Sequence, residues 1–328
     1  MTDRVPVSTV VPVYNDPAGI RETLDALVSQ SYPEADYEIL VVDNGSTDTT
    51  RSVVEGFADT YDHVELLVED QIQGSYAARN RGIRHAEGDV IAFLDADVTV
   101  GEEWLEDAVA AMDRRDAEYL ACDVHLEAPD ASDSLATRFN KRSGFPIERY
   151  VESLSFAPTC CLLVARQVFA ELGCFDERLI SGGDVEFGNR VYNSGRQLHY
   201  VSDVTATHPT RSTVSALAKK ASRVGRGRYQ LRAYYPGRYG TPVAMLLNPM
   251  TYSPPLPWLA PGAFDEFESL PLWEQVSMYL LLTVTKFSRA HGKVAQAASM
   301  GLAAALRRDA PERCQRMTRP VDGPNDSR

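Results

Sequence analysis

The stretch Val90-Ile-Ala-Phe-Leu-Asp-Ala-Asp-Val98 decides the fold of this chain. Five apolar residues lead directly into two carboxylates one residue apart, Asp95 and Asp97. A continuous apolar run this short is typical of a strand buried on both faces. The carboxylates stand at its C-terminal end, where open α/β sheets bind ligands. Two converging carboxylates repel each other without a cation, so the stretch favours a divalent metal site. A polar strand-to-turn exit is the alternative.

Three earlier segments have the composition of buried strands, and residues at helical spacing separate them. These strands are predicted at Val7–Val13, Glu38–Val42 and Val64–Val68. Alternating strands and helices of this rhythm predict a parallel, doubly wound α/β sheet. Polar turns follow the strands at Asn15 and at Asp43, and the carboxyl ends of parallel strands meet in one crevice. No glycine-rich loop precedes a helix in the pattern of a dinucleotide fingerprint or a P-loop.

Composition excludes several classes of protein. The chain has 46 acidic and 33 basic residues, and a net charge of −13 argues against nucleic-acid binding. Only 5 of the basic residues are Lys and 28 are Arg, which resembles proteins of a salt-rich cytoplasm, although a high-GC genome gives the same bias. Five cysteines without metal or disulfide-scaffold spacing predict reduced thiols in a cytoplasmic protein. We expect neither a signal peptide nor a transmembrane helix.

The second half of the chain contains three segments of unusual composition. Ala128–Ser155 is polar and aperiodic, so we expect a lid or an acceptor-facing insertion there. Basic residues gather between Lys219 and Arg232, which predicts a solvated helix face or a surface for anionic lipid or a phosphate-bearing acceptor. The apolar segment Trp273–Phe287 is too short to span a bilayer and predicts a buried helix or an interfacial anchor.

Four motifs in fixed order carry a resemblance to a known family. Together with an acidic helix start near position 184, they resemble the family 2 glycosyltransferases of GT-A fold, over about Val7 to His208. The motifs are Pro12–Asp16, Val42–Asp48, Ala77–Gly82 and Leu94–Asp97.

The resemblance implies a fold and a division into domains. The expected fold is α/β, a GT-A type, doubly wound and mostly parallel sheet (Rossmann-like) with a helical C-terminal extension. A catalytic domain would cover residues 1–212, with its nucleotide-sugar half at about 1–100 and its acceptor half at about 101–212. Residues 213–306 would form a helical, membrane-facing region, and residues 307–328 a flexible tail.

The resemblance also implies an activity, a cofactor and site residues. The activity would be the inverting transfer of one sugar from a UDP- or GDP-sugar to a hydroxyl, with Mn²⁺ or Mg²⁺ as cofactor. Asp97 and His208 would bind the metal, although an exposed loop histidine is the alternative for His208. The implied nucleotide-sugar residues are Pro12, Tyr14, Asn15, Asp43, Gly74, Arg79 and Asp95.

Asp184 matches the position of the catalytic base in this family. It would remove the proton of the acceptor hydroxyl during attack. A plain helix N-terminal cap is the alternative. The family usually has a Glu-Asp pair here, whereas this chain has Gly183 and Asp184, so the first acid is missing.

Two other kinds of protein compete with this interpretation. Phe93–Val100 also resembles the nucleophile motif of haloacid-dehalogenase-type phosphatases, with Asp95 as nucleophile. That motif normally opens the fold, however, and it leaves the turn at Tyr14 and the cluster at Asp43 unexplained. The other alternative is a module that binds a sugar nucleotide without catalysis. The presence of Asp184 at the position of the catalytic base argues against it. For the acceptor we hypothesise a polyprenyl phosphate-linked glycan, met at the cytoplasmic face of an anionic membrane.

Overall fold

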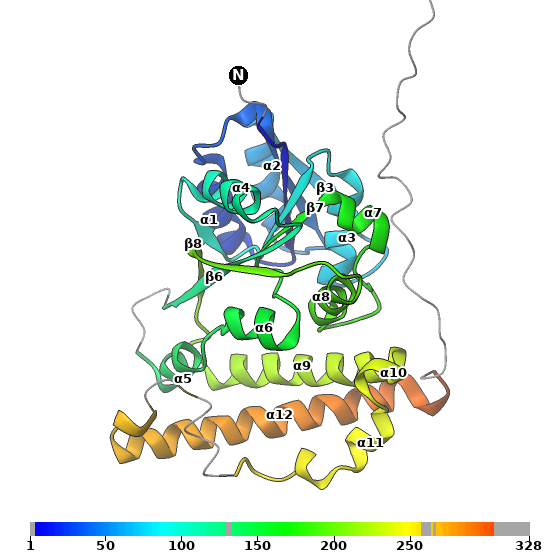
Figure 1. Ribbon diagram of the computed structural model, residues 1–328. Coiled ribbons are helices and arrows are strands. Elements are labelled where there is room, and N and C mark those ends of the chain that lie inside the picture. Colours follow the sequence, from blue (N-terminus) through cyan, green and yellow to red (C-terminus); the bar gives the residue numbers. More distant parts are fainter. Residues whose placement is uncertain (1–3, 129–132, 257–263, 265–266, 305–328) are drawn as a thin grey trace, which may run out of the picture.

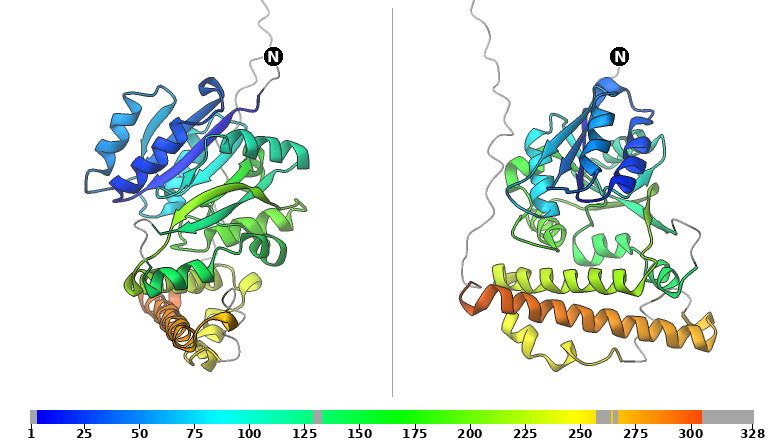
Figure 2. Two further views of the ribbon diagram at one scale, coloured as in Figure 1. Left: turned by 90° about the vertical axis from the view of Figure 1, so that its left-hand side faces the viewer. Right: turned by 180° about the vertical axis from the view of Figure 1, so that it is seen from behind.

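The computed structural model describes residues 4–128, 133–256, 264 and 267–304. An eight-stranded mixed sheet in the order β3-β2-β1-β4-β7-β6-β8-β5 forms the centre of the molecule. Helices cover both faces of this sheet, and a pair of long helices lies beneath it (Figures 1 and 2).

The first four strands form the parallel half of the sheet. Most of their apolar residues are buried, and all five residues of β4 are buried, as the opening stretch predicts. The strand predictions in this half are confirmed. The strands are β1 (Val7–Val13), β2 (Tyr37–Asp43), β3 (Val64–Val68) and β4 (Val90–Leu94). The connecting elements are α1 (Pro17–Val28), η1 (Glu34–Asp36), α2 (Thr50–Ala58) and α3 (Ser75–His85).

The second half of the sheet is mixed. Strand β7 (Cys161–Ala165) runs antiparallel to both β4 and β6 (Tyr119–Glu127), whereas β6 and β8 (His199–Pro209) are parallel. The short strand β5 (Thr99–Val100) pairs antiparallel with β8. The expectation of a mostly parallel sheet therefore holds for the strands β3, β2, β1 and β4. Beyond β4 the sheet is mixed, because β7 pairs antiparallel with β4.

The described part of Ala128–Ser155 contains two helices, although its sequence is aperiodic, and its role as a lid or acceptor-facing insertion stays a prediction. Helix α5 (Leu135–Ser143) buries Ala136 and Phe139, and α6 (Ile147–Leu154) buries Ile147 and Val151. Each helix thus contributes few apolar residues, and so short a pattern gives little periodic signal. The other helices of this half are α4 (Trp104–Arg115), α7 (Arg166–Leu172) and α8 (Gly183–Asn193).

The predicted helical C-terminal extension is present. Helices α9 (Val214–Tyr234) and α12 (Leu272–Ala304) run side by side beneath the sheet (Figures 1 and 2), and α12 is interrupted at Gly301, which has a φ of 63°. Along the chain, four short helices separate α9 from α12. They are α10 (Pro236–Tyr239), α11 (Pro242–Leu247), η2 (Pro249–Thr251) and η5 (Phe267–Ser269).

Two glycines allow α9 and α12 to touch. A Cβ atom at Gly225 would lie 2.1 Å from the carbonyl oxygen of Arg289, and one at Gly292 would lie 2.0 Å from that of Ser222. Each helix therefore places a glycine against the backbone of the other. The contact fixes where the α12 side chains around Arg289 stand relative to α9.

The structure bears on the predictions about the cysteines and about membrane-spanning helices. Cys122, Cys160 and Cys161 are buried free thiols, in line with the prediction at these three positions. Among the described residues, none of the helices combines the length and the apolar character needed to cross a bilayer. The predicted tail at residues 307–328 lies outside the described residues.

Candidate active site

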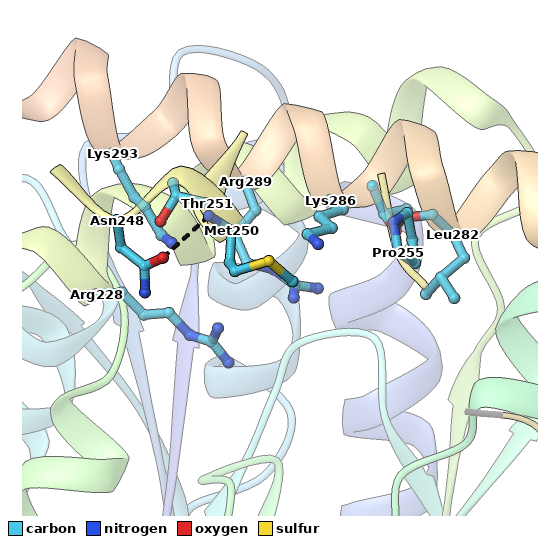
Figure 3. A pocket seen from close by; sticks show the side chains of 10 residues that line it. Arg228, Asn248, Met250, Thr251, Pro255, Leu282, Lys286, Arg289 and Lys293 are labelled. Carbon is cyan, nitrogen blue, oxygen red and sulfur yellow. Dashed lines mark hydrogen bonds between the residues drawn. The ribbon is translucent and has the colours of Figure 1, made fainter. Parts of the chain in front are cut away.

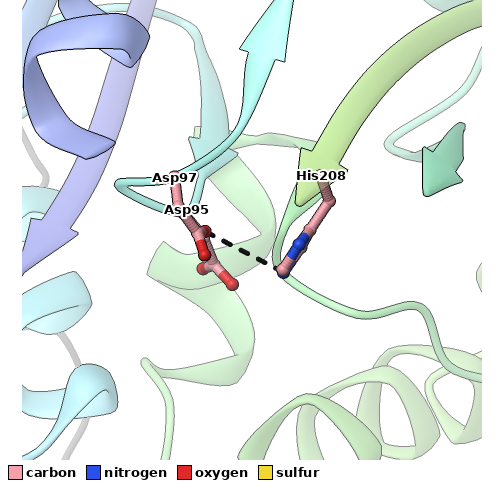
Figure 4. Close-up of side chains that lie close together, drawn as sticks. All are labelled: Asp95, Asp97 and His208. Atoms are coloured by element: carbon pink, nitrogen blue, oxygen red, sulfur yellow. Dashed lines mark ion pairs between the residues drawn. The ribbon is translucent and has the colours of Figure 1, made fainter. Parts of the chain in front are cut away.

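A cluster of possible metal ligands lies at the C-terminal end of β4. Asp95 and Asp97 follow that strand, and the pairing of Thr99 with Thr207 between β5 and β8 brings His208 beside them. One ligand atom from each of the three residues lies within 4.8 Å of the others (Figure 4). His208 Nε2 is 3.8 Å from Asp97 Oδ1. The sheet thus assembles the two predicted acids and the predicted histidine at one point.

The hydrogen bonding of His208 suits a metal ligand. Its Nδ1 lies 2.8 Å from the carbonyl oxygen of Pro209, which can only accept, so Nδ1 carries the proton. The lone pair of Nε2 is then free on the side of the acids. Burial raises the pKa of Asp97, and the neighbouring His208 opposes that effect. Two carboxylates and one imidazole nitrogen match the ligand chemistry of Mn²⁺.

Arg79 connects helix α3 to this cluster. Its side chain is almost completely buried, and its guanidinium forms a hydrogen-bonded ion pair with the carboxylate of Asp95. The guanidinium also lies 5.7 Å from the ring centre of Tyr76. The family resemblance implies Arg79 and Asp95 as two separate nucleotide-sugar residues, and the structure shows that their side chains are in contact.

Asp184 is the second residue of α8, and Tyr76 holds it in place. The Tyr76 hydroxyl donates a 3.1 Å hydrogen bond to Asp184 Oδ1 and lies 3.4 Å from the Asp184 backbone nitrogen. Burial raises the pKa of Asp184, whereas the hydrogen bonds from Val185 N–H and from Tyr76 lower it. A buried carboxylate with a raised pKa is a stronger proton acceptor than an exposed one.

The missing acid at position 183 has a physical reason. A Cβ atom at Gly183 would lie 2.8 Å from Cζ of Tyr76, so the tyrosine ring fills the space that a side chain would need. Tyr76 was not anticipated from the sequence. The glycine at position 183 was the one signal in the sequence. Protein interiors are closely packed, so a buried glycine indicates that a larger side chain occupies the space beside it.

The predicted site residues other than Asp97, which lies in the metal cluster, fall into two groups. One group lines a cavity of about 1040 Å³ below the sheet. Its members from the prediction are Pro12, Arg79, Asp95, Asp184 and His208.

The second group lies in the turns after β1, β2 and β3 and does not line that cavity. Tyr14 is 53% exposed. Asn15 Oδ1 accepts from Thr47 N–H at 2.8 Å, and Gly74 N–H donates to the Asn44 side chain. Their roles toward a nucleotide stay predictions.

Asp43 belongs to this second group and has partners inside the protein. Its buried carboxylate is 2.7 Å from the Arg51 guanidinium and also accepts from Ser46 N–H. Asp43 thus ties the turn after β2 to helix α2. A contact from Asp43 to a nucleobase stays a prediction.

Three cations also line the cavity. Arg211, Lys220 and Arg223 line it together with Asp95. Burial, together with the charges of Arg211 and Arg223, lowers the pKa of Lys220 to about 8. Arg211 Nη1 is buried without a hydrogen-bond partner among the described residues. The basic stretch beyond Lys219 was apparent in the sequence, whereas Arg211 was missed although it stands three residues after His208.

Comparisons with known proteins agree with this geometry. The family model Glycosyl transferase family 2 matches residues 8–173. The chain is 38% identical over 232 residues to glycosyltransferase AglE of Haloferax volcanii, which covers 70% of this chain and 76% of AglE.

Two solved structures are similar in fold. One is the mannosyltransferase PcManGT from Pyrobaculum calidifontis in complex with GDP-Man and Mn²⁺, with 20% identity, a TM-score of 0.62, and coverage of 92% of this chain and 89% of that one. The other is TarS of S. aureus in complex with UDP-GlcNAc, with 20% identity, a TM-score of 0.54, and coverage of 90% and 91%. These structures confirm the GT-A fold, and nothing among the comparisons supports the phosphatase alternative. With half of its length matched by the family model and most of AglE covered, the chain belongs to glycosyltransferase family 2.

Proposed function

We propose that this glycosyltransferase moves a single sugar, with inversion, from a nucleoside-diphosphate sugar to an acceptor hydroxyl. The observation that carries the proposal is that Asp184 and the Asp95–His208 end of the metal cluster line the same cavity. A proton acceptor and a site for a leaving diphosphate are thus available to one bound donor.

Asp184 is the proposed catalytic base. Its carboxylate takes the proton of the acceptor hydroxyl while that oxygen bonds to the anomeric carbon. The bond from the same carbon to the diphosphate oxygen breaks, and a single displacement of this kind inverts the configuration. Tyr76 occupies Oδ1 of Asp184, which leaves Oδ2 for the acceptor.

Asp97 and His208 are the proposed metal ligands, with Asp95 beside them. A divalent ion at this place neutralises charge on the diphosphate. The imidazole nitrogen favours Mn²⁺, because Mg²⁺ prefers oxygen ligands alone. Arg211, Lys220 and Arg223 add positive charge to the same cavity, where they attract the same diphosphate.

The proposed donor is a UDP- or GDP-sugar, since TarS was solved with UDP-GlcNAc and PcManGT with GDP-Man. The proposed acceptor is a polyprenyl phosphate-linked glycan used in cell-surface glycoprotein or polysaccharide assembly. The cations of α9 and the exposed apolar residues of α12 support a lipid-linked acceptor met by peripheral contact with an anionic membrane.

An Asp184→Asn variant tests the base assignment. We expect transfer to fall by about 10²–10⁴-fold, since the amide cannot accept the proton. Donor binding should persist, because the proposed diphosphate contacts are unchanged. A thermal-shift screen of nucleotide sugars with Mn²⁺ identifies the donor and measures its binding, and a transfer assay measures the rate.

Chelation is the matched control in the same experiment. EDTA should abolish both the donor-dependent thermal shift and the transfer in the unmodified protein, and Mn²⁺ should restore both. Transfer at the unmodified rate by Asp184→Asn would show that another group acts as base. A donor shift that is insensitive to EDTA would contradict the metal site.

A further inference from the structure

A second cavity, of about 280 Å³, lies between helices α9 and α12 and the segment from Asn248 to Pro255. Four cations line it, and Figure 3 shows three of them extending from α12 toward that segment while the fourth comes from α9. The α12 residues are Lys286, Arg289 and Lys293, and the α9 residue is Arg228. The proposed transfer reaction gives this cavity no role.

Within the described part of the chain, these four cations have no carboxylate partner. Lys286 Nζ donates to the carbonyl oxygen of Pro254 at 3.3 Å, and Nε of Arg289 is buried without any partner. Burial, reinforced by the neighbouring cations, lowers the pKa of Arg289 to about 10 and that of Lys293 to about 8. Gathered positive charge of this kind is costly without an anion, and it stands out in a chain of net charge −13.

Helix geometry builds the cluster on rigid elements. Lys286, Arg289 and Lys293 are three and four residues apart, so they project from one face of α12. The glycine contacts between α9 and α12 hold this face close to Arg228. The cations therefore converge because the two helices are packed, which differs from a solvated row of lysines on a free surface.

The second cavity adjoins the active-site cavity. Arg228, Asn248, Thr251 and Lys293 line both of them. A ligand whose hydroxyl meets Asp184 can thus extend an anionic group toward α12. We propose that the pocket of Arg228, Lys286, Arg289 and Lys293 binds a phosphate ester group of the acceptor. This inference rests on the proposed function, because it names a group of the same acceptor.

The chemistry of the lining favours a phosphate ester. A carboxylate has two acceptor oxygens and one negative charge for four cations, whereas a phosphate ester has more acceptor oxygens and, as a monoester or a diphosphate, also more charge. Met250, Pro255 and Leu282 line the same pocket. An apolar chain on the phosphate would lie against these side chains, whereas a soluble phosphate ester would leave them unused.

Binding without donor or divalent metal tests the proposal. Isothermal titration in EDTA would compare farnesyl phosphate, farnesol and glycerol phosphate as ligands. We expect farnesyl phosphate to bind and farnesol to bind at least tenfold more weakly. The double variant Arg289→Gln/Lys293→Gln should weaken farnesyl phosphate binding at least tenfold, and the single variant Lys293→Gln should weaken it less. Lys219→Ala, an exposed lysine of α9 outside both cavities, is the matched control and should bind normally.

The arms of this experiment give distinct outcomes. Equal affinity for glycerol phosphate and farnesyl phosphate would support a soluble phosphate ester as the source, and preference for farnesyl phosphate would support a lipid. Unmodified affinity in both Gln variants, or no binding of either phosphate, would overturn the proposal. Asp184→Asn should bind farnesyl phosphate normally, so a failure of the phosphate pocket and a failure of the catalytic base are distinguishable.

Discussion

At the scale of single residues, Tyr76 determines how Asp184 presents its carboxylate. The ring packs against Gly183, and the hydroxyl bonds both to Oδ1 and to the backbone nitrogen of Asp184. Burial raises the pKa of Asp184, and the Tyr76 hydrogen bond counteracts that rise. Tyr76 is therefore a positioning residue, and it acts on the reaction through the base.

The variant Tyr76→Phe tests this role. Without the hydroxyl the pKa of Asp184 rises further, so a higher pH is needed to ionise the base. We expect the acid limb of the pH–rate profile to move to higher pH and kcat to fall about tenfold, while the KM for the donor stays unchanged. Steady-state kinetics over a range of pH measure both effects.

Tyr37→Phe is the matched control for this experiment. Tyr37 is another buried tyrosine, and its hydroxyl donates to the Leu27 carbonyl away from the cavity. A purely structural role for Tyr76 would predict a lower melting temperature in both variants with an unmoved pH profile. An unmoved acid limb in Tyr76→Phe would therefore refute the positioning role.

The sequence predicts the acidic residues better than it predicts their partners. Asp95, Asp97 and Asp184 stand at the ends or starts of regular elements, where local patterns make them visible. Tyr76 lies 108 residues from Asp184 along the chain, and no local pattern connects the two. Long-range contacts of this kind depend on how α3 and α8 pack, which propensity and periodicity do not contain.

At the scale of elements, the packing of α9 on α12 depends on two glycines. An alanine at Gly225 would place its methyl group 2.1 Å from the Arg289 carbonyl oxygen, so the helices would have to separate. Overpacking of this kind costs about 1–3 kcal/mol, whereas the better helix propensity of alanine returns at most about 1 kcal/mol.

We therefore expect Gly225→Ala to destabilise the protein by up to about 2 kcal/mol, the overpacking cost less the full return from helix propensity. Denaturant unfolding measures this change in the free energy of unfolding. Gly56→Ala is the matched control, because Gly56 lies inside α2 with no atom within 4 Å of the added Cβ. The control should be stabilised. A Gly225→Ala protein as stable as the control would show that the helices do not touch as described.

The elements differ in how visible they are in the sequence. Strands β1 to β4 are rich in apolar and β-branched residues, and their positions follow from composition to within a residue at each end. Helices α5 and α6 are short and carry charged residues on most of their surface, so Ala128–Ser155 has no clear period. The placement of β7 between β4 and β6 is a matter of tertiary pairing, and the sequence gives no signal for it.

At the scale of the whole molecule, the exposed face of α12 is apolar. Trp273, Val276, Leu280, Val284 and Phe287 are exposed and follow one another at intervals of three or four residues. Leu247 of α11 is 76% exposed. An exposed apolar stripe on a helix indicates an interaction surface. This stripe supports the proposal that the C-terminal region contacts a membrane. The sequence of Trp273–Phe287 alone does not distinguish an interfacial anchor from a buried helix.

Flotation with liposomes of equal amounts of phosphatidylglycerol and phosphatidylcholine tests this contact. We expect the unmodified protein to float, because each large apolar side chain buried in the interface contributes up to about 1.5–3 kcal/mol. The double variant Leu280→Asp/Phe287→Asp should reduce the floating fraction at least tenfold, since two charges would have to enter the apolar layer. Ile72→Asp, at an exposed isoleucine in the loop between β3 and α3, should float normally.

Two contrary results would lead to different conclusions about the outer face of α12. If the unmodified protein does not float, and its mass in solution doubles in a way that Leu280→Asp abolishes, a second copy of the chain covers the stripe. If flotation persists in the double variant but is lost at high salt, the cations of α9 hold the membrane by charge alone. Either result removes the apolar stripe from the membrane contact and leaves the proposed active site untouched, because Asp184 and the metal cluster lie on the other side of α9 from α12.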